Sequence, residues 1–118
     1  MENETTFVNA AAQGDLYLQR VDAVPEGFVA TKPVENRYVV AHSETGHHHV
    51  VEAEPEVNYY TDPGEPMVAY LEVKKIVGAA LEHCRGFDTH KTLRIPQGIF
   101  KLSRQREYTP QGWRRVQD

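Results

Sequence analysis

Turn-forming residues divide this sequence into short segments, and this limits what the chain can fold into. The breaks are "VPEG" at 24–27, "TDPGEP" at 61–66, "PQG" at 96–98 and "TPQG" at 109–112. Proline removes a backbone donor and glycine adopts turn conformations, so a regular element ends at each of these points. Between these breaks, several runs of β-branched or alternating residues have the length of β-strands. None contains the run of about 18 apolar residues that crosses a membrane as a helix.

The segments between these breaks have the residue pattern of strands. Residues 14–22 alternate between apolar and polar positions, which is typical of a half-buried strand. Two β-branched runs, 36–42 and 47–53, flank "SETG" and predict a hairpin with a four-residue loop. Residues 91–95 and 99–108, on either side of "PQG", predict a second pair of strands.

One segment fits two structures. Residues 67–84, "MVAYLEVKKIVGAALEHC", have apolar residues at helical spacing, but their first part is dense in β-branched and apolar residues. Gly78 would cost a helix about 1 kcal/mol relative to alanine. We favour a strand over 67–74 and a second short strand before His83. The sequence therefore predicts a mainly-β single domain, a small barrel or sandwich with at most one short helix.

The bulk composition is that of one soluble globular domain. The chain has 118 residues, of which 40% are hydrophobic and 25% charged. Within this single β-rich domain, 1–118, we expect a loosely ordered N-terminal arm at 1–13 and a C-terminal tail at 109–118 that folds back. The N-terminal residues lack the basic and apolar regions of a secretory signal. The single cysteine, Cys84, excludes an internal disulfide, so we expect an intracellular setting.

Acidic and basic residues are unevenly distributed. Residues 1–90 carry a formal charge of −9 and residues 91–118 carry +5. In "RQREY", strand alternation places Arg104 and Arg106 on one face, where they are candidates for contacting an anionic ligand or nucleic acid. Ion pairing within the fold explains the same pattern, and we favour it. We expect no significant nucleic-acid binding at physiological salt, because the acidic part of the chain repels phosphate.

A histidine cluster is the most specific feature of the sequence. The stretch "AHSETGHHHVV" at 41–51 contains four of the six histidines. If "SETG" forms the hairpin loop, His42 pairs with His47 and Val40 pairs with His49. Directly paired residues share a face, as do residues two apart, so His42, His47 and His49 converge. Since Zn–N bonds are about 2.0–2.1 Å, three such imidazoles predict a site for zinc or a similar divalent transition metal.

Other residues can complete or support this site. His83 and His90 flank "CRGFDT" and are candidates for the remaining ligands. Glu52 is the candidate for orienting a ligand or for acting as a general base if the metal is catalytic. Two alternatives to metal binding stay open: a polar, hydrogen-bonding patch, and an interface or pH-responsive cluster.

The order of these residues resembles the metal-binding motifs of the cupin superfamily of small β-barrels. In cupins an HxH is followed by a glutamate, and a later Pro-x-Gly-x-x-His supplies another ligand. Here "HHHVVE" and "PQGIFK" match parts of the two motifs, but Lys101 stands where the last histidine would be. The resemblance implies a cupin-like architecture in which His83 or His90 replaces the missing ligand.

Three longer stretches extend over nearly the whole chain: "GDLYLQRVDAVPEG", "AHSETGHHHVVE" and "IPQGIFKLSRQREYTPQGWRRVQD". They resemble a family of small uncharacterised proteins from bacteria and their phages, with "TGHxH" and "LPxGxYxVxxQREY" motifs. The resemblance implies a common fold and a shared histidine site, in the cytoplasm of a bacterial host or in a virion.

Two functional hypotheses follow from the sequence. The first is a small metal-binding β-barrel protein. The second is a non-enzymatic structural or accessory protein of a phage or prophage, a virion component or host-interaction factor with histidines in packing or assembly roles. Both leave open a homo-oligomer or assembly into a larger particle, and neither gives the chain a membrane partner.

Overall fold

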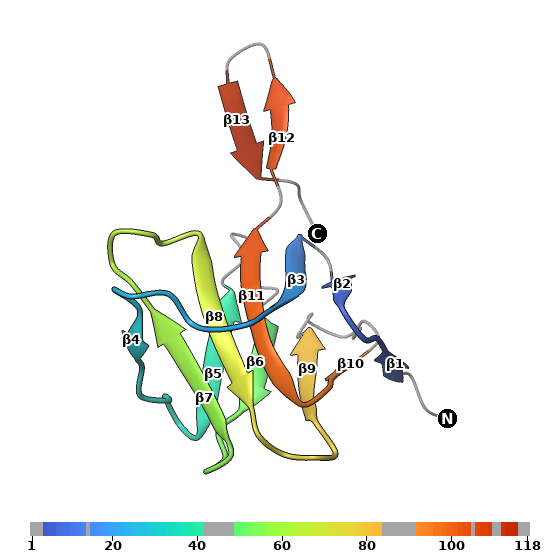
Figure 1. Cartoon of the computed structure of the whole chain (residues 1–118). Coiled ribbons are helices and arrows are strands. Elements are labelled where there is room, and N and C mark those ends of the chain that lie inside the picture. Colours follow the sequence, from blue (N-terminus) through green and yellow to red (C-terminus); the bar gives the residue numbers. More distant parts are fainter. Residues whose placement is uncertain are drawn as a thin grey trace.

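The chain folds into β-strands joined by turns (Figure 1). The computed structural model describes residues 4–13, 15–41, 49–83, 92–104, 106–109 and 112–115. Side chains are described for residues 6–13, 15–40, 49–82 and 92–104. No helix occurs among the described residues, so the prediction of a small, mainly-β domain is confirmed. Accordingly, the described part of the chain has no helix that could cross a membrane.

The first sheet has five strands in the order β1-β10-β9-β6-β5. Neighbouring strands in it are antiparallel, except for the parallel pair of β1 and β10. Its strands are β1 (Glu4–Thr6), β5 (Arg37–Ala41), β6 (His49–Glu52), β9 (Ala79–His83) and β10 (Thr92–Ile95).

The second sheet has six strands in the order β2-β3-β11-β8-β7-β4, all antiparallel to their neighbours. Its strands are β2 (Ala10–Gln13), β3 (Leu16–Val21), β4 (Val29–Ala30), β7 (Val57–Thr61), β8 (Val68–Val73) and β11 (Gly98–Arg104). The segment expected to be a loose arm, 1–13, thus contributes β1 to one sheet and β2 to the other.

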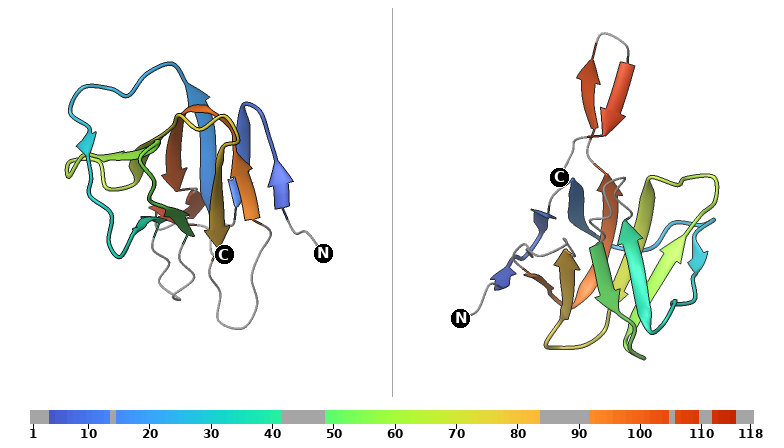
Figure 2. Two further views of the ribbon diagram at one scale, coloured as in Figure 1. Left: turned by 90° about the horizontal axis from the view of Figure 1, so that it is seen from below. Right: turned by 180° about the vertical axis from the view of Figure 1, so that it is seen from behind.

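Two short strands form a third sheet at the C-terminal end. β12 (Arg106–Thr109) pairs with β13 (Gly112–Arg115), and this hairpin extends beyond the two larger sheets in Figures 1 and 2. The strand predicted over 99–108 is therefore two strands in different sheets. Within the predicted tail, residues 112–115 form β13, and whether the tail folds back onto the body of the domain stays a prediction.

The hydrophobic core lies between the two large sheets. Alternate residues of each strand face inward, as in Leu16 and Leu18 of β3 and Phe100 and Leu102 of β11, which are all at most 1% exposed. Each sheet keeps two edge strands, so the architecture is sandwich-like and not a closed barrel. Of the two predicted architectures the sandwich is confirmed, and the cupin-like barrel is not.

The ambiguous segment 67–84 forms two strands, as predicted, and the alternative helix is wrong. β8 and β9 are joined by a turn in which the Gly78 amide donates to the Lys75 carbonyl oxygen at 3.0 Å. Gly78 has a φ of +80°, and a Cβ atom built on it would lie 2.4 Å from the backbone oxygen of Ile95. The glycine that weakens a helix here is therefore required by the turn.

The histidine hairpin departs from the predicted register at the end nearer its loop. Ala41, rather than Val40, pairs with His49, and Val39 pairs with Val50. The extra residue between Val39 and Ala41 forms a β-bulge, which shifts the register by one residue. Residues 42–48, which include the predicted loop and the pairing of His42 with His47, lie outside the described residues.

Candidate functional site

A fully buried histidine lies between the two sheets. His49 begins β6 and has an exposed fraction of 0%. Val51, two residues later, belongs to the hydrophobic core, and residues two apart in a strand share a face, so the His49 side chain also points inward. A buried imidazole needs polar partners, because its ring nitrogens lose their contact with water.

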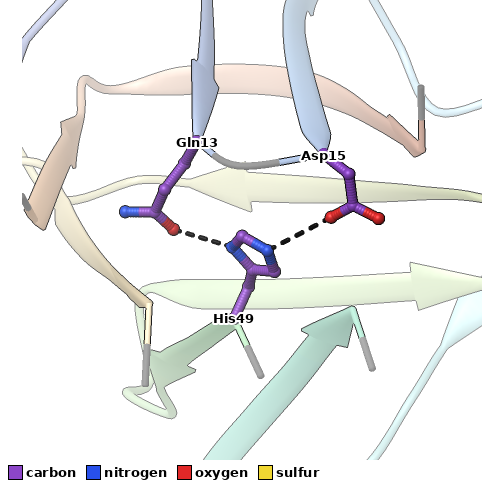
Figure 3. Close-up of polar contacts among 3 residues, drawn as sticks. All are labelled: Gln13, Asp15 and His49. Atoms are coloured by element: carbon purple, nitrogen blue, oxygen red, sulfur yellow. Dashed lines mark hydrogen bonds and ion pairs between the residues drawn. The ribbon is translucent and has the colours of Figure 1, made fainter. Parts of the chain in front are cut away.

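Gln13, at the end of β2, forms a hydrogen bond with one ring nitrogen of His49 (Figure 3). The Gln13 Nε2 donates to the Leu81 carbonyl oxygen at 3.0 Å, so its Oε1 is the atom that faces the imidazole. His49 Nδ1 lies 2.9 Å from this Oε1. An amide oxygen can only accept, so Nδ1 carries the hydrogen and donates it. The contacts of Gln13 therefore fix the tautomer of His49 and join the second sheet to the first.

Asp15, immediately before β3, lies beside the other ring nitrogen (Figure 3). Its side chain is buried, and its Oδ1 is 3.5 Å from His49 Nε2. This distance is longer than the about 2.7–3.2 Å of an N–H···O hydrogen bond. With the Nδ1 hydrogen fixed, a neutral His49 directs the Nε2 lone pair towards a carboxylate. That arrangement is favourable when a positive charge, a proton on Nε2 or a metal ion, lies between the two atoms.

The backbone places a second histidine directly opposite His49. His83 ends β9 and is the register partner of His49 across the antiparallel pair of β6 and β9. The backbones of His83 and His49 are therefore adjacent, as the prediction requires. That their ring nitrogens lie within ligand distance of one ion stays a prediction. His42, His47 and His90 lie outside the described residues.

The described residues supply two donor atoms for a metal, His49 Nε2 and Asp15 Oδ1. Within the described ranges no group of three or more His, Cys, Asp or Glu side chains could hold an ion. A complete site would therefore need donors whose side chains are not among the described ones.

Glu52 does not occupy the place expected for it. It is exposed at the end of β6, with Oε2 3.9 Å from Arg37 Nε. Residues three apart in a strand lie on opposite faces, so Glu52 points away from the side occupied by His49. Among the described residues, Gln13 and Asp15 lie beside the imidazole, and the sequence interpretation missed both. The signal that could have found them is the pair of polar residues around Gly14, where an alternating strand begins.

The two predicted anion-binding arginines are in different sheets. Arg104 ends β11, and Arg106 begins β12. Arg104 is half-buried and lines a pocket between the large sheets. The side chain of Arg106 lies outside the described part of the structure.

Comparison with known proteins gives one match. The model of a domain of unknown function, DUF8820, matches residues 12–105 of the chain. This range includes Gln13, Asp15 and His49, and it ends before β12. A search of the curated proteins found no match, and a search of the solved structures found none either.

Proposed function

We propose a function from the buried site itself, because the chain belongs to DUF8820, a family of domains whose function is unknown. The protein binds a divalent transition metal, zinc or a similar ion that prefers imidazole, between its two sheets. Its ligands include His49 Nε2 and Asp15 Oδ1. As in the sequence-based hypothesis, histidines bind the metal. Asp15 is added to the proposed ligands, and Glu52 is no longer proposed to lie near the ion.

The observation that carries this proposal is the separation of the two donor atoms. His49 Nε2 and Asp15 Oδ1 are 3.5 Å apart. Two ligands bound at about 2.0–2.2 Å to one tetrahedral zinc are about 3.3–3.6 Å apart. The separation is thus that of two neighbouring corners of a zinc tetrahedron. An ion between the two atoms would also replace the repulsion between a lone pair and a carboxylate with two attractive contacts.

Gln13 supports the same function from the other side of the ring. A metal-bound imidazole usually donates its second N–H to an oxygen acceptor, which fixes its orientation and raises its basicity. The hydrogen bond from His49 Nδ1 to Gln13 Oε1, at 2.9 Å, supplies this contact. We assign the remaining ligands to His83, whose backbone is paired with that of His49, and to His42, His47 or His90.

The proposal is tested by zinc titration of tag-free, metal-stripped protein against a chromophoric chelator. We expect one zinc ion per chain. Asp15→Asn keeps the shape of the side chain but weakens a ligand. Gln13→Leu removes no ligand, but it removes the contact that orients His49 and the hydrogen bond to Leu81. We therefore expect a loss of affinity of about 10–100-fold for Gln13→Leu and a larger loss for Asp15→Asn.

Asp22→Asn, which alters an exposed carboxylate, is the control and should bind zinc like the wild type. Folding of each variant is checked by circular dichroism. If the folded, metal-free protein takes up no zinc, or if Asp15→Asn binds it as tightly as the wild type does, the proposal is wrong.

A second candidate function is structural, as the sequence also suggests. The contacts of Gln13 with Leu81 and His49 link β2 to β9 and β6, so this polar network also joins the two sheets without a metal. In that case His49 is protonated and forms an ion pair with Asp15 where the metal would otherwise lie. The protein is then a non-enzymatic structural or accessory component of a phage or prophage. Failure of zinc binding in the titration would favour this candidate.

A further inference from the structure

A pocket of about 260 Å³ lies between the two sheets and is lined by residues of both. Both sheets contribute to its apolar floor, which includes Leu16, Val40, Tyr59 and Leu102, all buried. Burial raises the pKa of Tyr59 to about 12, so its phenol stays neutral at physiological pH. The Tyr59 hydroxyl donates to the Val40 carbonyl oxygen at 3.4 Å. The floor is therefore apolar and uncharged.

The turn between β7 and β8 forms one rim of this pocket and is held by its own hydrogen bonds. The Gly64 amide donates to Asp62 Oδ1 at 2.9 Å, and the Glu65 amide donates to the Asp62 carbonyl oxygen at 2.8 Å. Two prolines, Pro63 and Pro66, restrict the backbone further. The rim is thus formed before any ligand arrives, which reduces the entropy lost on binding.

Arg104 brings a positive charge to the apolar floor. Phe100 and Leu102 face the core from β11, and Arg104 continues the same face two residues later. It is half-buried, and a guanidinium in such a position usually has a carboxylate partner. Ion pairs in the described part of the chain include those of Arg37 with Glu52 and of Lys75 with Glu54, and Arg104 belongs to neither.

We infer that this pocket binds a small organic carboxylate, with the carboxylate on Arg104 and an apolar body on the floor. The guanidinium offers paired N–H donors that match the two oxygens of a carboxylate. The volume is below the about 300–1,000 Å³ of pockets for drug-sized ligands, so the ligand has the size of a benzoate or a short branched fatty acid.

The acidic residues of the rim do not reverse this preference. Asp62 Oδ1 already accepts the hydrogen bond from Gly64, and Glu65 is exposed, so water screens its charge. Arg104 is the charged group that shares a strand face with the buried floor, where electrostatic interactions are stronger. A cationic ligand would instead contact the rim and leave the guanidinium without a partner.

The inference is tested by titrating ¹⁵N-labelled protein with benzoate, and with benzamide and benzylamine as neutral and cationic analogues. We expect benzoate alone to shift the amide signals of residues around the pocket. Arg104→Gln should weaken benzoate binding at least about tenfold, because it removes a charge-assisted pair of hydrogen bonds. Lys101→Gln is the matched control, because Lys101 lies on the opposite face of the same strand.

Three results would overturn the inference: no benzoate binding at tens of millimolar, equal binding by Arg104→Gln, or preferred binding of benzylamine that Asp62→Asn abolishes. The inference does not rest on the metal site. Benzoate should bind equally well to metal-stripped and zinc-loaded protein, so failure of one proposal leaves the other testable.

Discussion

Replacing His49 with alanine should abolish zinc binding and lower the free energy of unfolding of the metal-free protein by about 2–4 kcal/mol. The change removes the donor to Gln13 Oε1 and the partner of Asp15 Oδ1, and both of these side chains are buried. It also leaves a cavity where a ring that is 0% exposed had been packed. Urea unfolding of the metal-stripped protein measures the loss.

Glu52→Gln on the same strand is the control for this experiment. The Glu52 side chain is 62% exposed and its ion pair with Arg37 is long, at 3.9 Å. We expect the free energy of unfolding to change by less than about 0.5 kcal/mol and zinc affinity to stay unchanged. If His49→Ala were as stable as Glu52→Gln, the buried network would not contribute to the fold as described.

Replacing Gly78 with alanine should lower the free energy of unfolding by at least about 2 kcal/mol. The backbone of Gly78 has a φ of +80°, which strains any residue with a Cβ atom. The added Cβ would also lie 2.4 Å from the Ile95 carbonyl oxygen, a backbone atom that cannot move without displacing β10. Urea unfolding again provides the measurement.

Gly64→Ala is the matched control for Gly78→Ala. A Cβ at Gly64 would lie 3.5 Å from Asp62 Oδ1, which is an ordinary van der Waals contact. The substitution keeps the amide that donates to Asp62, so we expect a change of less than about 1 kcal/mol. If the two variants lost the same free energy of unfolding, the positive φ of Gly78 would not be required for the turn.

Much of the fold could be predicted from local sequence patterns. The period-two alternation around Leu16 and Leu18 predicts β3, and the β-branched runs predict β5 and β6. Breaks that contain proline and glycine predict where β7, β10 and β12 end, because proline cannot donate to a strand ladder and glycine favours turns. The prediction of a single strand over 99–108 was wrong, since alternation continues through "LSRQREY" and gives no sign of a change of sheet.

The pairing of strands could not be derived from the same patterns. The prediction that Val40 pairs with His49 failed because a bulge adds one residue to β5, and no local signal marks it. The choice between sandwich and barrel also depends on which edges pair over long range, which alternation does not specify.

The candidate site was found only in part, for the same reason. The histidine pattern singled out His49, but Gln13 and Asp15, which contact its ring, lie more than 30 residues earlier in the chain. Sequence proximity instead favoured Glu52, although a residue three positions along a strand lies on the opposite face. Contacts such as those of His49 with Gln13 and Asp15 depend on how the two sheets pack, which local sequence patterns do not specify.

Imidazole ¹⁵N NMR of the protein during a zinc titration is the most direct test of the proposed metal site. The long-range ¹H–¹⁵N spectrum distinguishes a protonated, a bare and a metal-bound ring nitrogen. We predict that His49 keeps its hydrogen on Nδ1, where Gln13 holds it, and that its Nε2 signal moves to the metal-bound position at one equivalent of zinc. Nε2 that stays protonated opposite Asp15 throughout the titration would contradict the metal site and identify the pair as a structural one.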